Sequence, residues 1–175
     1  HYLPVTDENC LQDIALPLPH PTAHDLLIKV EAISVNPVDT KVRAPKDLIE
    51  AQAKVLGWDA CGTVVSVGEG VTLFSPGQKV FYAGDITRAG CNSEFHLIDE
   101  RLVGHAPETL SIEQAAAIPL TALTAWEAIF NRLGINLDGA LPGDTVQKSI
   151  LIIGGAGGVG SIASQLASNL AGLNV

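Results

Sequence analysis

The residues from Gly154 to Gly160 carry the clearest chemical signal in the sequence. They read Gly-Gly-Ala-Gly-Gly-Val-Gly, and Gly155, Gly157 and Gly160 fit the spacing G-x-G-x-x-G. Between a buried strand and a helix, such glycines permit a tight turn, close approach of a pyrophosphate to bare backbone, and close packing of helix on sheet. Free N–H groups and the positive end of the helix dipole then face the phosphates. The predicted dinucleotide-binding residues are Gly155, Ala156, Gly157, Gly158, Val159 and Gly160.

Two features around these glycines bear on which nucleotide binds. No Lys-Ser or Lys-Thr pair follows them, which disfavours a P-loop NTPase. The acidic residue that holds the ribose of NAD is expected roughly 20 residues further on, where the sequence ends at Val175. The choice between NAD and NADP therefore stays open, and a glycine-rich turn without a ligand is the plain alternative.

The elements next to the glycines are those of an α/β domain. Ser149–Ile153 is an uninterrupted apolar segment, typical of a strand buried on both faces of a parallel sheet. A helix is expected from Val159 to about Ala171, and a turn over Leu141–Asp144. Together these segments predict the opening strand and helix of a doubly wound fold.

Near Ser111, before this α/β unit, the sequence changes from strand-like to helix-like segments. Ser111 and Gln114 have the spacing of a capping box, and the helix that they begin is expected to continue to Pro119. A longer helix is predicted over residues 120–133, ended by Gly134 in the position after the last helical turn.

The first two-thirds of the chain is rich in strand-like segments. Short apolar runs with partial two-residue alternation are bounded by Pro and Gly. We expect strands at Leu26–Val35, Cys61–Gly68, Gly77–Tyr82 and Ser93–Ile98, and a short helix at Asp47–Lys54. Short strands without a long helix among them predict a small barrel or sandwich.

Composition narrows the class of protein. The 175 residues carry a net charge of −9 and are 47% hydrophobic, which indicates a packed, acidic protein. Without a basic stripe, binding to nucleic acid or an anionic membrane is not expected. The three cysteines lack the spacing of a zinc site or redox dithiol. No apolar run reaches the ~20 residues that span a bilayer, and the start lacks the pattern of a signal peptide. We expect a cytoplasmic protein with a small-molecule substrate.

Three separated segments resemble the quinone oxidoreductase branch of the medium-chain dehydrogenase/reductase superfamily. Asn36-Pro37-Val38-Asp39-Thr40 is similar to the N-P-x-D loop of that branch, and Ala115 to Trp126 to its stretch entering the cofactor domain. Gly154 to Gly160 resembles its phosphate loop. The likeness runs over nearly the whole chain and is greatest to members named zinc-type alcohol dehydrogenase-like proteins.

The resemblance implies a GroES-like β-barrel catalytic domain over residues 1–118. Residues 119–175 would then form the N-terminal part of a Rossmann NAD(P)-binding domain with a doubly wound parallel sheet. Related chains return to the barrel through C-terminal segments that are not in this sequence, so it is expected to be a truncated chain. The resemblance further implies a homodimer for the full-length protein.

A zinc-dependent reaction is not expected, although the proteins that this chain resembles are named zinc-type. Zinc-dependent relatives place a Cys where this chain has Asn36, and Gly-His-Glu where it has Gly57-Trp58-Asp59. A catalytic zinc needs about three protein ligands from Cys, His or carboxylate, and neither Asn36 nor Trp58 suits it. A structural zinc in such relatives is held by a lobe with four cysteines. The corresponding half of this chain has only Cys61 and Cys91, so it cannot form that lobe. The implied cofactor is NADPH, with NADH open, and no zinc.

The implied activity is hydride transfer to a quinone or an α,β-unsaturated carbonyl. The nicotinamide supplies the hydride, and the developing oxyanion needs hydrogen-bond donors. We predict Asn36, Thr40 and Tyr82 as these catalytic donors and Trp58 as an apolar wall of the substrate pocket. Thr124 resembles the threonine that supports the nicotinamide side of the cofactor.

Each of these residues has a structural alternative. Asn36 suits a turn, Asp39 an ion pair or a helix cap, and Tyr82 a core position with a satisfied hydroxyl. Trp58 could serve packing alone, and Thr124 could bond back to a helix carbonyl.

Two other functions stay open. A zinc-dependent alcohol dehydrogenase would lose activity with its metal. A non-enzymatic NADPH-binding sensor or structural protein would bind cofactor without turnover.

Overall fold

The computed structural model describes residues 10–44, 53–137 and 149–175. The chain forms two compact units, His1–Pro119 and Leu120–Val175. The predicted turn at Leu141–Asp144 lies outside the described residues. So does most of the predicted helix at Asp47–Lys54, of which Ala53 and Lys54 are described and are not helical. No helix among the described residues is long and apolar enough to cross a membrane.

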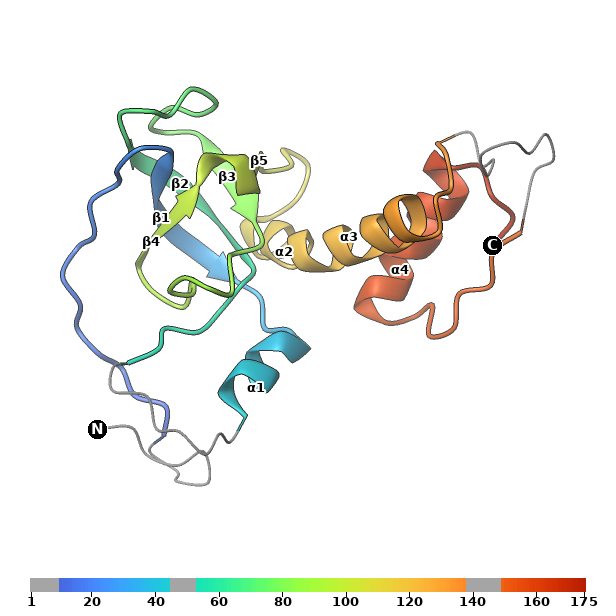
Figure 1. Cartoon of the computed structure of the whole chain (residues 1–175), viewed down its shortest axis with the longest axis horizontal. Helices are drawn as coiled ribbons and strands as arrows, with labels where there is room; N and C mark the ends of the chain where they lie inside the picture. Colours follow the sequence, from blue (N-terminus) through green and yellow to red (C-terminus); the bar gives the residue numbers. More distant parts are fainter. Residues whose placement is uncertain (1–9, 45–52, 138–148) are drawn as a thin grey trace. The chain divides into compact units, whose positions relative to one another are not determined.

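The first unit is a curled antiparallel sheet of the half-barrel type (Figure 1). Its strand order is β4-β1-β2-β3-β5. The strands are β1 (Asp25–Ile33), β2 (Ala60–Val67), β3 (Lys79–Tyr82), β4 (Phe95–Asp99) and β5 (Val103–His105). The four predicted strands are confirmed. β5 was not predicted, because three residues with a central glycine are too short to show an alternating pattern.

The core of the first unit comes from one face of these strands. Successive side chains of a strand point to opposite faces, so core residues recur at a spacing of two. Leu26 and Ile28 of β1 are fully buried, as are Val80 and Tyr82 of β3. The buried cluster consists of Leu26, Ile28, Ala60, Val64, Phe74, Val80, Tyr82, Cys91 and Ile98.

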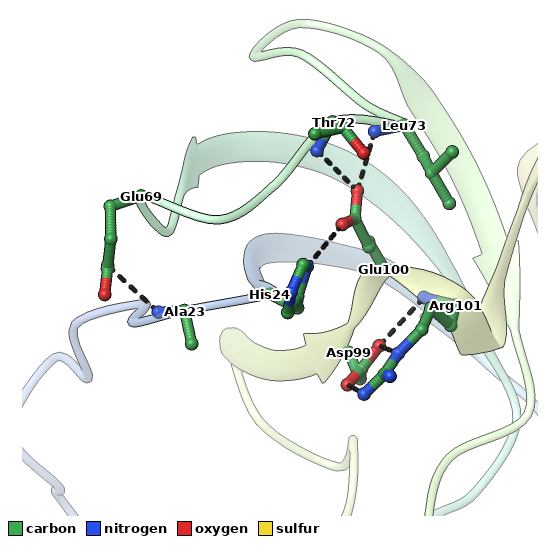
Figure 2. A network of polar contacts seen from close by, with 8 residues as sticks. All are labelled: Ala23, His24, Glu69, Thr72, Leu73, Asp99, Glu100 and Arg101. Atoms are coloured by element: carbon green, nitrogen blue, oxygen red, sulfur yellow. Dashed lines mark hydrogen bonds and ion pairs between the residues drawn. The ribbon is translucent and has the colours of Figure 1, made fainter.

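A buried carboxylate ties three segments of the first unit together (Figure 2). Glu100 begins a 3₁₀ turn, Glu100–Leu102, and is 2% exposed. Its Oε1 lies 2.8 Å from Nδ1 of His24, and its Oε2 accepts the backbone N–H groups of Thr72 (2.9 Å) and Leu73 (2.7 Å). Because a buried charge is tolerated only with such partners, this carboxylate fixes the loop before β3 against the turn before β1.

Two short helices complete the first unit. α1 (Pro37–Arg43) follows β1, with Asn36 as its N-cap and a proline at its start. α2 (Ile112–Ala116) has the predicted capping box between Ser111 and Gln114, which confirms that prediction.

The described residues of the second unit form two helical segments. α3 (Pro119–Trp126) continues as a π-helical segment, Glu127–Arg132, and Gly134 follows with φ +67°. The prediction of a long helix ended by Gly134 is therefore confirmed. α4 (Gly158–Gln165) continues likewise over Leu166–Leu170. The buried core of this unit is Ala125, Ile129, Ala163, Ala167, Ala171 and Leu173.

The prediction of a strand buried on both faces at Ser149–Ile153 is wrong for this structure. Within residues 149–175 and the other described ranges, its strand-type pairing is one parallel bridge between Ser149 and Asn174. Ile150 and Ile152 pack against the core of the second unit, whereas Leu151 and Ile153 are 87% and 91% exposed. The segment thus alternates as a strand does, but among the described residues only one of its faces is covered.

Candidate cofactor and substrate sites

The glycine-rich turn leads directly into α4. Gly154 has φ +75°, a backbone conformation that favours glycine. Its carbonyl accepts the N–H of Gly157 at 3.0 Å, and Gly157 is the N-cap of α4. A Cβ atom on Gly160 would overlap the carbonyl oxygen of Gly154 and the backbone of Gly155. Close contact between turn and helix therefore requires glycine at position 160.

This turn fits the pyrophosphate of a dinucleotide. The first N–H groups of a helix have no partner within that helix, and they lie at the positive end of its dipole. Ala156, Gly157 and Gly158 are exposed, so the backbone here is accessible to an anion. A Cβ on Gly155 would meet only ordinary contacts, at 3.7 Å. An alanine at position 155 would therefore fit within the folded protein.

Two threonines of α3 differ in their relation to the glycine turn. Cγ2 of Thr121 lies 3.2 Å from the position of a Cβ on Gly158, so this side chain packs directly on the turn. Thr124 is exposed, and its hydroxyl donates to the carbonyl of Leu120 at 2.7 Å. This is the bond to a helix carbonyl that the sequence analysis gave as the structural alternative for Thr124. A contact between Thr124 and the cofactor stays a prediction.

Asn36 lies between two buried carboxylates of the first unit. Its backbone N–H donates to Oδ2 of Asp39 at 2.6 Å, the reciprocal half of a capping box. Its side-chain Nδ2 donates to Oδ2 of Asp59 at 3.0 Å and to the carbonyl of Ser34 at 3.5 Å. Asp39 is 8% exposed and Asp59 is fully buried. Asp39 thus caps α1, in agreement with the structural alternative given above.

The hydroxyls of the other two predicted donors are bonded within the protein. Thr40 is exposed, and its hydroxyl donates to the carbonyl of Pro37 at 2.8 Å. Tyr82 is 1% exposed, and its hydroxyl lies 2.9 Å from Nδ1 of His96. Burial raises the pKa of Tyr82 well above its usual value. To donate to a substrate, each hydroxyl would first have to release its present partner.

Trp58 is a core residue in this structure. It is 2% exposed, and its indole N–H donates to the carbonyl of Asp85 at 3.2 Å. A Cβ on Gly84 would lie 3.2 Å from the indole. The ring is therefore packed against the backbone after β3, and a role as a pocket wall stays a prediction.

The part of the chain that the structure describes shows no arrangement of side chains that suits a zinc ion. Among the described residues, no group of three or more His, Cys, Asp or Glu side chains is arranged to hold a metal. The indole of Trp58 offers a donor rather than a lone pair, and Asn36 offers only a neutral amide oxygen, which is not among the usual zinc ligands. Burial raises the pKa of the Cys91 thiol to about 11, and this thiol donates to the backbone carbonyl of Asp59 at 3.6 Å.

Sequence reasoning missed Asp59 as the partner of Asn36. The two residues are 23 positions apart, and only the pairing of β1 with β2 brings them together. Thr121 was also missed as a neighbour of the glycine turn. Its signals were its position at the start of a predicted helix and its place in the segment from Ala115 to Trp126 that resembles the family.

A curled antiparallel half-barrel followed by a glycine-rich turn and helix defines a class of nucleotide-dependent oxidoreductase folds. Residues 22–121 match the alcohol dehydrogenase GroES-like domain. The chain belongs to this family, within the medium-chain dehydrogenase/reductase superfamily.

Known relatives carry several kinds of name, among them alcohol dehydrogenase and quinone oxidoreductase. A zinc-type alcohol dehydrogenase-like protein of Staphylococcus epidermidis is 49% identical over 91% of this chain and 46% of its own length. A Rhizobium etli CFN 42 structure, described as a proposed zinc-dependent alcohol dehydrogenase, is 52% identical with a TM-score of 0.85, covering 99% of this chain and 49% of that one. The NADPH complex of Escherichia coli quinone oxidoreductase is 29% identical with a TM-score of 0.73, over 98% and 48%. The chain spans about half the length of these relatives.

Proposed function

We propose that this chain is part of a zinc-independent, NADPH-dependent oxidoreductase that transfers hydride to a quinone or an α,β-unsaturated carbonyl. The observation that carries this proposal is the glycine turn at the start of α4, whose backbone fits a pyrophosphate. The quinone oxidoreductase neighbour with bound NADPH supports the choice of cofactor and substrate class.

In the proposed reaction NADPH supplies the hydride, and a proton from solvent completes reduction of the acceptor. The backbone from Gly155 to Gly160 binds the pyrophosphate, with Thr121 packed against Gly158 to hold the turn in place. The segment from Asn36 to Thr40 supplies polar contacts to the bound substrate or cofactor. We keep Tyr82 as a predicted donor, although its hydroxyl is engaged with His96.

Zinc independence rests on residue chemistry rather than on family names. Two positions that hold ligands in zinc-dependent relatives are Asn36 and Trp58 here. A quinone or enone has an electron-poor carbon that accepts hydride without a Lewis acid, whereas an unactivated ketone gains much more from one. The substitution of both ligands therefore favours the conjugated substrates.

The test is a turnover assay of the full-length protein. NADPH oxidation is followed with 1,4-benzoquinone and with an enone, before and after dialysis against a chelator. We expect turnover that the chelator leaves unchanged. Loss of activity on chelation with recovery on adding Zn²⁺ would show a zinc alcohol dehydrogenase instead. Tight NADPH binding without turnover of any quinone or enone would show a binding protein.

The predicted homodimer rests on the family resemblance, and the predicted cytoplasmic location rests on the composition and sequence pattern of the chain. Sedimentation velocity on the full-length protein and fluorescence localisation in the source cell would test them, and a monomer or a membrane-bound pool would contradict these predictions.

A further inference from the structure

The side chain of Asn36 is oriented by a buried neighbour. An asparagine amide has two N–H donors on its nitrogen and one acceptor oxygen. Nδ2 of Asn36 donates to Oδ2 of Asp59 at 3.0 Å and makes a longer contact of 3.5 Å with the carbonyl of Ser34. Both donors of this amide are therefore directed into the protein.

Asp59 is itself held in place. It is fully buried, and its backbone carbonyl accepts the N–H of Ser34 at 2.9 Å and the thiol of Cys91 at 3.6 Å. It directly follows the buried Trp58 and precedes β2. Because the backbone of Asp59 is anchored in this way, its side chain is kept beside Asn36 as an acceptor.

A flipped amide would be unfavourable at this position. With Asp59 ionised, a flipped amide would place Oδ1 of Asn36 against two groups that offer only acceptor oxygens, the carboxylate of Asp59 and the carbonyl of Ser34. The orientation with Nδ2 toward Asp59 is therefore preferred. Oδ1 of Asn36 faces the N–H of Asp39 in the capping box and has a second lone pair, and because Asn36 is only half-buried, this oxygen is the group that it offers to a ligand.

Thr40, one helical turn further on, presents the same chemistry. Its hydroxyl hydrogen is given to the carbonyl of Pro37, and its oxygen retains lone-pair capacity. The two polar side chains at this end of α1 thus present acceptors, where sequence reasoning predicted donors.

We propose that Asp59 is a positioning residue that fixes the amide of Asn36, so that Asn36 recognises a hydrogen-bond donor, an O–H or N–H group, on its ligand. This inference rests on the proposed function for its setting, since the donor belongs either to the bound cofactor or to the substrate. It changes the role of Asn36 from stabilising an oxyanion to orienting a donor-bearing group.

The orientation is tested first, without any turnover. The side-chain amide resonances of Asn36 in the full-length protein, assigned through Asn36→Ala, should show one N–H protected from exchange with solvent. Asp59→Asn retains an acceptor oxygen and should keep that protection, whereas Asp59→Leu should remove it. Asn131→Ala is the matched control, an exposed asparagine on the π-helical segment after α3. An unprotected Asn36 amide in the unaltered protein would overturn the proposal.

A second experiment measures ligand binding and turnover, and it distinguishes the two sources of the hydrogen-bond donor, the cofactor and the substrate. If the cofactor carries it, Asn36→Ala should raise the Kd for NADPH about tenfold. If the substrate carries it, Asn36→Ala should leave the Kd for NADPH unchanged. The variant should then lose about tenfold in kcat/KM with a hydroxymethyl-substituted benzoquinone, whose hydroxyl is a donor, but not with the methyl analogue, which has none. Asp59→Asn should stay within about threefold of the unaltered protein in both. Unchanged values for both ligands in Asn36→Ala would overturn the donor assignment.

Failure of the proposed function is recognised separately. A protein that turns over no quinone or enone still gives the amide exchange and the NADPH affinity, which decide the positioning role of Asp59. If Asp59→Leu does not fold, the exchange protection of the Asn36 amide in the unaltered protein and in Asp59→Asn still decides whether Asp59 positions Asn36.

Discussion

The hydroxyl of Tyr82 lies 2.9 Å from Nδ1 of His96 and joins two strands that share no backbone pairing. Nε2 of His96 lies 3.0 Å from the carbonyl of Ala89, which can only accept, so Nε2 carries the ring hydrogen and Nδ1 accepts from Tyr82. Burial lowers the pKa of His96 and raises that of Tyr82. Both groups are therefore neutral, and this hydrogen bond links β3 to β4 across the curled sheet.

Replacing Tyr82 by Phe tests whether this residue is structural or catalytic. The change leaves Nδ1 of His96 buried without its donor, which costs about 1–3 kcal/mol of unfolding free energy. Urea unfolding should show this loss, and the loss should shrink in the background of His96→Phe because the partners are coupled. If Tyr82 instead donates to substrate, kcat falls while the unfolding free energy is unchanged, which would contradict the structural role.

How far the sequence predicts this molecule depends on the range of the interactions. The four longer strands, the capping box at Ser111 and the helix end at Gly134 follow from local patterns, and all are present. The resemblance describes residues 36–40 as a loop, whereas the structure has helix α1 there, and its seven residues are too few to show a clear periodicity. The roles of Asn36 and Tyr82 depend on Asp59 and His96, and no local pattern names such partners. The apolar segment at 149–153 shows that strand formation also needs neighbours.

Two glycine variants separate the fold of the turn from its use. Gly160→Ala places a Cβ against the carbonyl of Gly154, so it should cost about 1–3 kcal/mol of stability and weaken NADPH binding by at least about tenfold. Gly155→Ala meets only contacts at 3.7 Å, so its melting temperature should be unchanged. Any rise in its Kd for NADPH then reports close approach of the pyrophosphate. Equal NADPH affinity in both variants and the unaltered protein would contradict cofactor binding at this turn.

The two tryptophans offer a matched comparison of core and surface. Trp58 is 2% exposed and Trp126 is 41% exposed. Trp58→Ala should cost about 3–5 kcal/mol, and Trp126→Ala clearly less, measured by chemical unfolding. Trp58→Phe keeps most of the volume but loses the bond to Asp85. A change in quinone KM for Trp58→Phe without loss of stability would support the predicted pocket wall, and unchanged KM would contradict it.

Acid sensitivity of the first unit should depend on Glu100. Burial raises the pKa of this carboxyl, but the hydrogen bonds from His24, Leu73 and Thr72 outweigh it, so the pKa lies below the ordinary 4.5. A lowered carboxyl pKa stabilises the fold above the unfolded pKa, and that stabilisation is lost as pH falls through the lower folded value. Glu100→Gln should therefore lower the melting temperature by about 5 °C at pH 7. The difference from the unaltered protein should narrow steadily from pH 5 to pH 3. Glu94→Gln, at an exposed position just before β4, removes the same charge and should change neither value. A Glu100→Gln deficit that stays constant down to pH 3 would mean that the carboxylate charge is not what holds these three segments together.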